Sequence, residues 1–211
     1  MTVLAAGAIP PPSPPAEPIP SILRRIQKLA TPTALLAFLQ IAAQLLETWI
    51  AARQGTAALA GWAVVLPFAL LMQQMSAGAM GGGVVSAIAR ALGGNREQEA
   101  SSLVLHAALI AIIGGGLFAL LLAVFPLTLL GLIAGPVAAE AAAPYAIWLF
   151  GAGAIPLWLA NTLASVLRGG GRHGLAARVL TLGYIVYPPL SWLLAEPLGM
   201  GLAGIGAAFA L

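Results

Sequence analysis

The feature that most constrains this chain is a series of apolar stretches, each about twenty residues or longer, separated by short polar or glycine-rich segments. A helix rises about 1.5 Å per residue, so about 20 apolar residues cross a hydrocarbon core about 30 Å thick. Only 7% of the residues are charged. That is too few to cover the surface of a water-soluble domain. The sequence therefore predicts an all-α membrane protein, folded as a polytopic helical bundle.

The polar breaks predict about five complete transmembrane helices and an incomplete sixth. The predicted spans are residues 31–52, 57–92, 101–125, 137–167, 175–195 and 202–211. The second is too long for one straight crossing, so we expect a bent or extended helix there. The last reaches only about 15 Å, and we interpret it as a helix inside which the chain stops.

Prolines set the N-terminal region apart from the predicted membrane lobe, which covers residues 22–211. Residues 1–21 hold seven of the sixteen prolines of the chain. Such a run favours extended polyproline conformations, and we expect a disordered tail. Residues 1–9 contain no Lys or Arg, so the start of the chain does not resemble a signal peptide.

The distribution of basic residues predicts the orientation of the bundle. If the N-terminus is cytoplasmic, only Arg53 lies on the outer side, and eight basic residues lie on the cytoplasmic side: Arg24, Arg25, Lys28, Arg90, Arg96, Arg168, Arg172 and Arg178. The positive-inside rule favours this arrangement. Trp49 and Trp62 flank the first outer loop, where we expect them in the interfacial aromatic belt.

Several kinds of chemistry are excluded or disfavoured by the residues present. The chain has no Cys and no Asp, so a disulfide, a zinc-thiolate site or an Asp-based phosphoryl-transfer site cannot form. His106 and His173 have no acid near them in sequence, and we expect no metal site. No complete set of acid, base and nucleophile exists, so we predict no enzyme, no cofactor and no nucleic-acid partner. The glycines of residues 78–83 indicate close helix packing rather than a phosphate loop.

The most informative residue is Glu47, an acid inside the first predicted span. Gln40, Gln44 and Glu47 follow one another at i, i+4 and i+7, which places them on one helix face. An acid in the membrane costs several kcal/mol unless it is protonated, paired or facing water. This stripe predicts a cavity in which Glu47 exchanges a proton or another cation. The alternative is that Glu47 lies near the interface, or pairs with Arg53, without a function.

Asn161 is the other polar residue expected deep in the membrane, on the fourth predicted span. An isolated Asn there is well explained by a hydrogen bond to a neighbouring helix, which contributes about 1 kcal/mol. A role on the wall of a cavity is the functional alternative.

Four short motifs stand at the ends of the predicted helices. Glu47-Thr48 is followed by Gly55 and an Ala-Leu-Ala segment at 58–60, and an Ala-Arg-x-x-Gly motif covers residues 89–93. Leu-Arg-Gly-Gly-Gly follows at 167–171, and a glycine-rich segment at 199–206 precedes the last stretch. In this order, over residues 22–211, the motifs resemble those of the multidrug and toxic compound extrusion (MATE) transporters.

The resemblance implies one lobe of a twelve-helix antiporter with two six-helix lobes, located in the cytoplasmic (inner) membrane of a prokaryote. Such a protein exports cationic or amphipathic drugs in exchange for protons or sodium ions. Glu47 then matches the coupling acid of the first helix, and Pro32 matches the proline at which that helix bends. Gln40, Gln44, Thr48 and Asn161 are the expected cavity-lining residues. The implied partners are the lipid bilayer, the exported compounds, and a missing C-terminal lobe or a second copy.

The chain also departs from the family pattern. An Asn-x-x-x-Asp pair that some members carry on the fifth helix falls on Gly183 and Tyr187, which tilts the expectation towards protons. Two other functions remain open. A flippase for lipid-linked precursors would place basic residues in the cavity, and none lies mid-span here. A non-transporting scaffold or inactive fragment would pair through the glycine face of residues 78–83.

Overall fold

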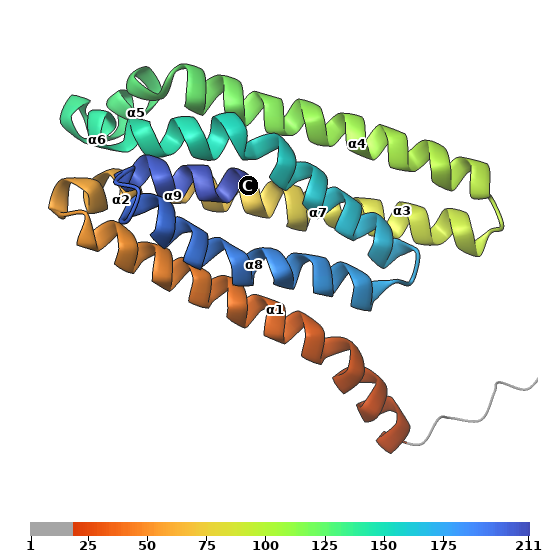
Figure 1. Ribbon diagram of the computed structural model, residues 1–211. Helices are drawn as coiled ribbons and strands as arrows, with labels where there is room; N and C mark the ends of the chain where they lie inside the picture. The colour runs from red at the N-terminus through yellow and green to blue at the C-terminus, as the bar shows by residue number, and fades with distance from the viewer. Residues whose placement is uncertain (1–18) are drawn as a thin grey trace, which may run out of the picture.

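The computed structural model describes residues 19–211, and all regular elements among these residues are helices (Figure 1). The predicted all-α class is confirmed. Three of the elements, labelled η, are π-helical segments that continue an α-helix. In chain order the elements are α1 (Ile19–Arg53), α2 (Thr56–Gln73), η1 (Gln74–Met80), α3 (Gly81–Gly93), α4 (Glu97–Ala119), η2 (Leu120–Val124), α5 (Pro126–Ala134), α6 (Pro136–Ala146), η3 (Ile147–Ala152), α7 (Ala154–Gly169), α8 (His173–Ala195) and α9 (Gly201–Ala210).

The helices run up and down in one bundle, with the loops gathered at its two ends (Figure 1). In the described part of the chain, Ala34–Arg53, Thr56–Gly93 and Glu97–Val124 are long and apolar enough to cross a membrane. A fourth span is possible where Pro136–Ala152 and Ala154–Gly169 meet at a bend of 46°. Helix α8 lies beside α1 and is less apolar than these three segments. Large apolar side chains, such as Phe38, Leu105 and Leu132, cover the outside. Such a surface is suited to lipid.

The two ends of the bundle differ in charge in the way that the sequence indicates. The α3–α4 loop and the α7–α8 loop lie at the same end as the start of α1 (Figure 1). The α1–α2 loop and the α8–α9 turn lie at the opposite end. Arg96 and Arg172 are therefore at one end, and Arg53 is at the other.

Two predicted boundaries are wrong. Helix α1 begins at Ile19, so the expected tail overlaps the helix at residues 19–21, while residues 1–18 lie outside the described part. The predicted first span, which starts at residue 31, is consequently the later part of a longer helix. The break between the predicted spans 101–125 and 137–167 contains the short helix α5. Pro126 and Pro136 take first-turn positions, where a missing N–H costs nothing, and Gly135 supplies the break between the helices with φ of +83°.

The expectation of close packing at residues 78–83 is also wrong for most of its glycines. A methyl group added at Gly78, Gly82 or Gly83 would meet no other described atom within 4 Å. Close approaches occur elsewhere: a Cβ on Gly61 would lie 2.6 Å from the carbonyl of Ala141, which joins α2 to α6. Small residues let helices approach only where a partner helix faces them, and sequence spacing alone does not identify that face.

An ion pair fastens the far end of α1 to the end of α8. Arg53 Nε lies 2.6 Å from Glu196 Oε1, and its guanidinium group stands 4.9 Å from the ring centre of Trp49. Trp192 Nε1 donates to the second oxygen of Glu196 at 3.2 Å. These four side chains hold the α1–α2 hairpin against the α8–α9 turn.

Arg53→Ala is expected to lower the free energy of unfolding by only about 0.2–1 kcal/mol, because the Arg53 side chain is 53% exposed and the pair is screened. Urea unfolding of the detergent-solubilised protein, followed by circular dichroism, measures this. High salt should reduce the difference from the unchanged protein, with Arg178→Ala as the matched control, because Arg178 is exposed and forms no ion pair with the described residues. A loss of several kcal/mol would contradict a screened pair.

Candidate functional site: a cavity around a buried glutamate

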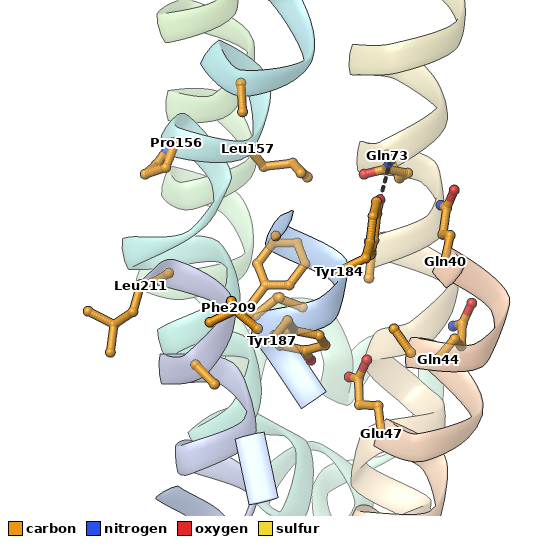
Figure 2. Close-up of a pocket in the computed structure, with 18 of the residues that line it drawn as sticks. Gln40, Gln44, Glu47, Gln73, Pro156, Leu157, Tyr184, Tyr187, Phe209 and Leu211 are labelled. Carbon is orange, nitrogen blue, oxygen red and sulfur yellow. Dashed lines mark hydrogen bonds between the residues drawn. The ribbon is translucent and has the colours of Figure 1, made fainter. Parts of the chain in front are cut away.

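A cavity of about 370 Å³ lies among α1, α2, α6, α7, α8 and α9 (Figure 2). Its apolar wall includes Leu157, Val186 and Phe209. Its polar lining consists of Gln40, Gln44, Glu47, Gln73, Tyr145, Asn161, Tyr184 and Tyr187. Among residues 19–211, no Lys or Arg lines it, and Glu47 is the only lining residue that can carry a charge near neutral pH. The cavity is therefore mixed aromatic and polar, with a single acid.

Glu47 is held by two neutral donors from other helices. Its side chain is 9% exposed, and its Oε1 accepts a hydrogen bond of 2.8 Å from the indole Nε1 of Trp62. The hydroxyl of Tyr145 on α6 donates to the same oxygen. Arg53 binds Glu196 instead, so Glu47 does not form the ion pair with Arg53 that was one form of the non-functional alternative.

A third hydroxyl, that of Tyr187 on α8, lies near the Glu47 carboxyl group but forms no hydrogen bond with it. It points towards the carboxyl group of Glu47 (Figure 2). The hydroxyl is buried and has no hydrogen-bond partner within residues 19–211, and the same holds for the hydroxyl of Ser191, one turn further along α8. The ring of Tyr187 packs edge-on against Phe209 at 5.6 Å, which fixes its direction. A buried polar group without a partner is unusual and marks a place where a further hydrogen bond can form.

The predicted stripe on α1 faces the cavity. Gln40, Gln44 and Glu47 line it in succession (Figure 2). Thr48 does not line the cavity, and this placement was wrong. Its hydroxyl donates to the backbone carbonyl of Gln44 at 2.7 Å, because a Thr in a helix readily bonds to the carbonyl four residues earlier. The side chain of residue 32 lies outside what the structure describes, so the proposed bend at Pro32 stays a prediction.

Asn161 both lines the cavity and forms a hydrogen bond to a neighbouring helix, the two roles considered for it. It lies on the cavity wall, and its Nδ2 donates to the hydroxyl of Ser76 in η1 at 2.8 Å. Ser76 in turn donates to the carbonyl of Gln73, at the point where the π-helical segment begins. The Gln73 side chain donates to the Tyr184 hydroxyl at 3.2 Å, joining α2 to α8 across the cavity (Figure 2).

Sequence reasoning placed Trp62 in the interfacial belt, and this was wrong, since the side chain is 4% exposed and bonded to Glu47. The spacing in the sequence could have predicted the contact between Trp62 and Glu47. Gln54 and Gly55 form the turn between α1 and α2, and positions 47 and 62 are equally distant from it. In an antiparallel helical hairpin, such positions lie opposite each other. Tyr145 comes from a distant helix, and no local pattern indicates it.

In the described part of the chain, no group of three His, Cys, Asp or Glu side chains could hold a metal ion. The chemistry available at the cavity is therefore that of one carboxyl group, several hydroxyl and amide groups, and aromatic faces. Such a set can bind a proton or a cation at Glu47 and can stack flat or aliphatic molecules against its walls.

Comparison with known proteins places this geometry in context. The MatE family model matches residues 32–193. A MOP superfamily transporter from Pyrococcus furiosus, reported for the reverse polarity of its binding pocket, has 25% sequence identity and a TM-score of 0.77. A multidrug resistance MATE family transporter in an outward-facing conformation has the same identity and score. A MATE protein in complex with MaL6 has 26% identity and a TM-score of 0.79.

Each of these matches covers 88% of this chain but only 41% of the solved one. The chain thus spans less than half the length of the proteins it resembles in structure. A search of curated proteins found no match.

Proposed function

Because this chain belongs to the MatE family, as a multi-pass membrane protein that corresponds to the N-terminal lobe of a transporter, we propose that it works in an antiporter. The antiporter exports cationic or amphipathic drugs in exchange for protons or sodium ions. Glu47 carries the coupling ion, and Gln40, Gln44 and Asn161 line the route of the exported compound. Bending of α1 at Pro32 opens and closes that route.

The observation that carries this proposal is the single buried acid on a cavity without basic residues. A positively charged compound and a coupling ion both bind favourably to a carboxylate, and burial strengthens that attraction. When one occupies Glu47, the other is disfavoured. Competition for one carboxyl group is the simplest physical basis for exchange, because it prevents both from travelling in the same direction. A lipid-linked pyrophosphate finds no basic partner in this cavity.

Alternating access requires two lobes or repeats that move against each other around a shared site. The chain spans about 41% of the length of its solved relatives. We therefore propose that the working transporter contains a second lobe, supplied by a C-terminal half or by another copy. The lipid bilayer surrounds both lobes.

The test uses the complete protein as the source cell makes it, reconstituted into liposomes. A fluorescent lipophilic cation and a lipophilic anion of similar size are loaded in parallel. We expect an imposed proton or sodium gradient to drive export of the cation and not of the anion. Preferential export of the anion would overturn the proposed substrate class.

The orientation proposed here has the N-terminus in the cytoplasm of a prokaryote and the basic end of the bundle inside. The chain has no Cys, so a single introduced thiol reports its own position. Thr56 and His173 are exposed at opposite ends of the bundle. In intact cells, a membrane-impermeant maleimide is expected to label Thr56→Cys and to leave His173→Cys unlabelled until the membrane is permeabilised. The reverse pattern would contradict this orientation.

A further inference from the structure

The partners of Glu47 are hydrogen-bond donors, and this restricts the ions that its carboxyl group can bind. Trp62 offers an indole N–H, which donates and has no lone pair available for a metal. The N–H points at Oε1 from 2.8 Å, and the Tyr145 hydroxyl donates to the same atom. The lone pairs of Oε1 are thereby occupied by two donors whose positive ends face the oxygen.

A sodium ion needs a shell of oxygen atoms with lone pairs directed at it, as hard cations generally do. Close to Glu47, the described residues offer the hydroxyls of Tyr145 and Tyr187 and, one turn away on α1, the side-chain amide of Gln44, besides the carboxylate itself (Figure 2). The Tyr145 hydroxyl is already turned to donate. On the side of Oε1 that Trp62 occupies, the carboxylate meets an N–H donor instead of an oxygen ligand, so this side adds nothing to a sodium shell.

A proton, in contrast, needs one free carboxylate oxygen and one acceptor. The hydrogen bonds that Glu47 accepts from Trp62 and Tyr145 both end on Oε1, and Glu47 lines the cavity. A proton from cavity water binds Oε2 and converts the carboxylate to a neutral acid. The new O–H then finds an acceptor in the Tyr187 hydroxyl, which is buried, unpaired and directed at it (Figure 2). Release returns the proton to water, and the two bonds to Oε1 persist throughout.

We infer that Trp62 is a positioning residue that makes the Glu47 site selective for a proton over a sodium ion. This assignment rests on the proposed function, in which Glu47 carries the coupling ion. Trp62 acts by donating to Oε1 in place of an oxygen ligand.

No positive charge takes part in this selection. The titratable groups that face Glu47 are Tyr145 from α6 and Tyr187 from α8. Helix α2 contributes the indole of Trp62 and, on the cavity wall, the uncharged Gln73, and the part of α9 at the cavity contributes Phe209 and small residues. Arg53, on the same helix as Glu47, is bound to Glu196. The anionic form of Glu47 is thus supported by hydrogen bonds from neutral groups.

The test is an infrared titration of the carboxyl band of the complete reconstituted protein, with Glu47→Gln identifying the band. It is performed in sodium chloride and in choline chloride of equal ionic strength. We expect the same midpoint in both salts. In Trp62→Phe the carboxylate loses one donor, so the midpoint is expected to move to higher pH by about one unit.

Two further variants separate the loss of the donor from a general disturbance of the fold. Trp158 is also a buried tryptophan, but its Nε1 has no partner within the described residues, so Trp158→Phe should leave the midpoint unchanged. Tyr145→Phe removes the other donor to Oε1 and should shift the midpoint in the same direction as Trp62→Phe.

A midpoint that falls when sodium replaces choline would overturn the selectivity, and an unchanged midpoint in Trp62→Phe would overturn the role of Trp62. The titration does not require transport. Failure of the proposed function would instead be seen as absent gradient-driven export, while the titration still decides the preference of Glu47.

Discussion

Glu47→Gln is expected to reduce ion-driven export to the level of empty liposomes while leaving the protein folded in the membrane. The amide oxygen of Gln can still accept from Trp62 and Tyr145, so the local packing is preserved. The amide cannot ionise, and the site is fixed in a state equivalent to the protonated acid. A carrier that cannot lose its ion cannot complete an exchange cycle.

Glu140→Gln is the matched control for this experiment. It replaces the same carboxyl group by the same amide, but at an exposed position on α6. Its transport should equal that of the unchanged protein. Both variants should elute as the same monodisperse peak from a sizing column. Undiminished export by Glu47→Gln would remove Glu47 from the coupling role.

The second large effect is expected from a single methyl group at Gly61. Its Cβ would lie 2.6 Å from the Ala141 carbonyl carbon and oxygen, which belong to the backbone of α6 and cannot rotate away. Helices α2 and α6 would have to separate, at a cost of about 3 kcal/mol. The displacement would reach the Glu47 site, because Trp62 follows Gly61 and Tyr145 lies on α6.

Gly82→Ala is the control, since a Cβ there meets no described atom within 4 Å. In a helix this change should be neutral or stabilising by about 0.5–1 kcal/mol. Thermal unfolding of the two variants in the same detergent measures the difference. Equal stability of Gly61→Ala and Gly82→Ala would contradict the close approach of α2 and α6.

The parts of the fold that could be predicted depend on local information. Apolar length predicts helices in a membrane, and the spacing of Gln40, Gln44 and Glu47 predicts a polar face. The start of α1 at Ile19 was missed because the predicted tail includes the whole proline-rich segment up to residue 21. A proline is nevertheless well tolerated in the first turn of a helix. Helix α5 was missed because the prolines and glycines of residues 126–136 were interpreted as a break between two spans, although Pro126 occupies the first turn of this helix.

The candidate site could be predicted only on the side that α1 provides. Trp62 and Tyr145 meet Glu47 from other helices, and that contact depends on how the helices are aligned against one another. The α1–α2 alignment was within reach, because the turn at Gln54 and Gly55 is short. The position of α6 was not, because it depends on packing such as the contact between Gly61 and Ala141.

The most direct test of the central claim is uphill transport by the complete protein in liposomes. The liposomes contain a fluorescent organic cation at the same concentration on both sides and are exposed to an imposed proton gradient or, separately, a sodium gradient. We expect the cation to move against its own rising gradient, and only while the ion gradient lasts. Movement that stops at equal concentrations, with either ion, would contradict ion-coupled antiport by this lobe.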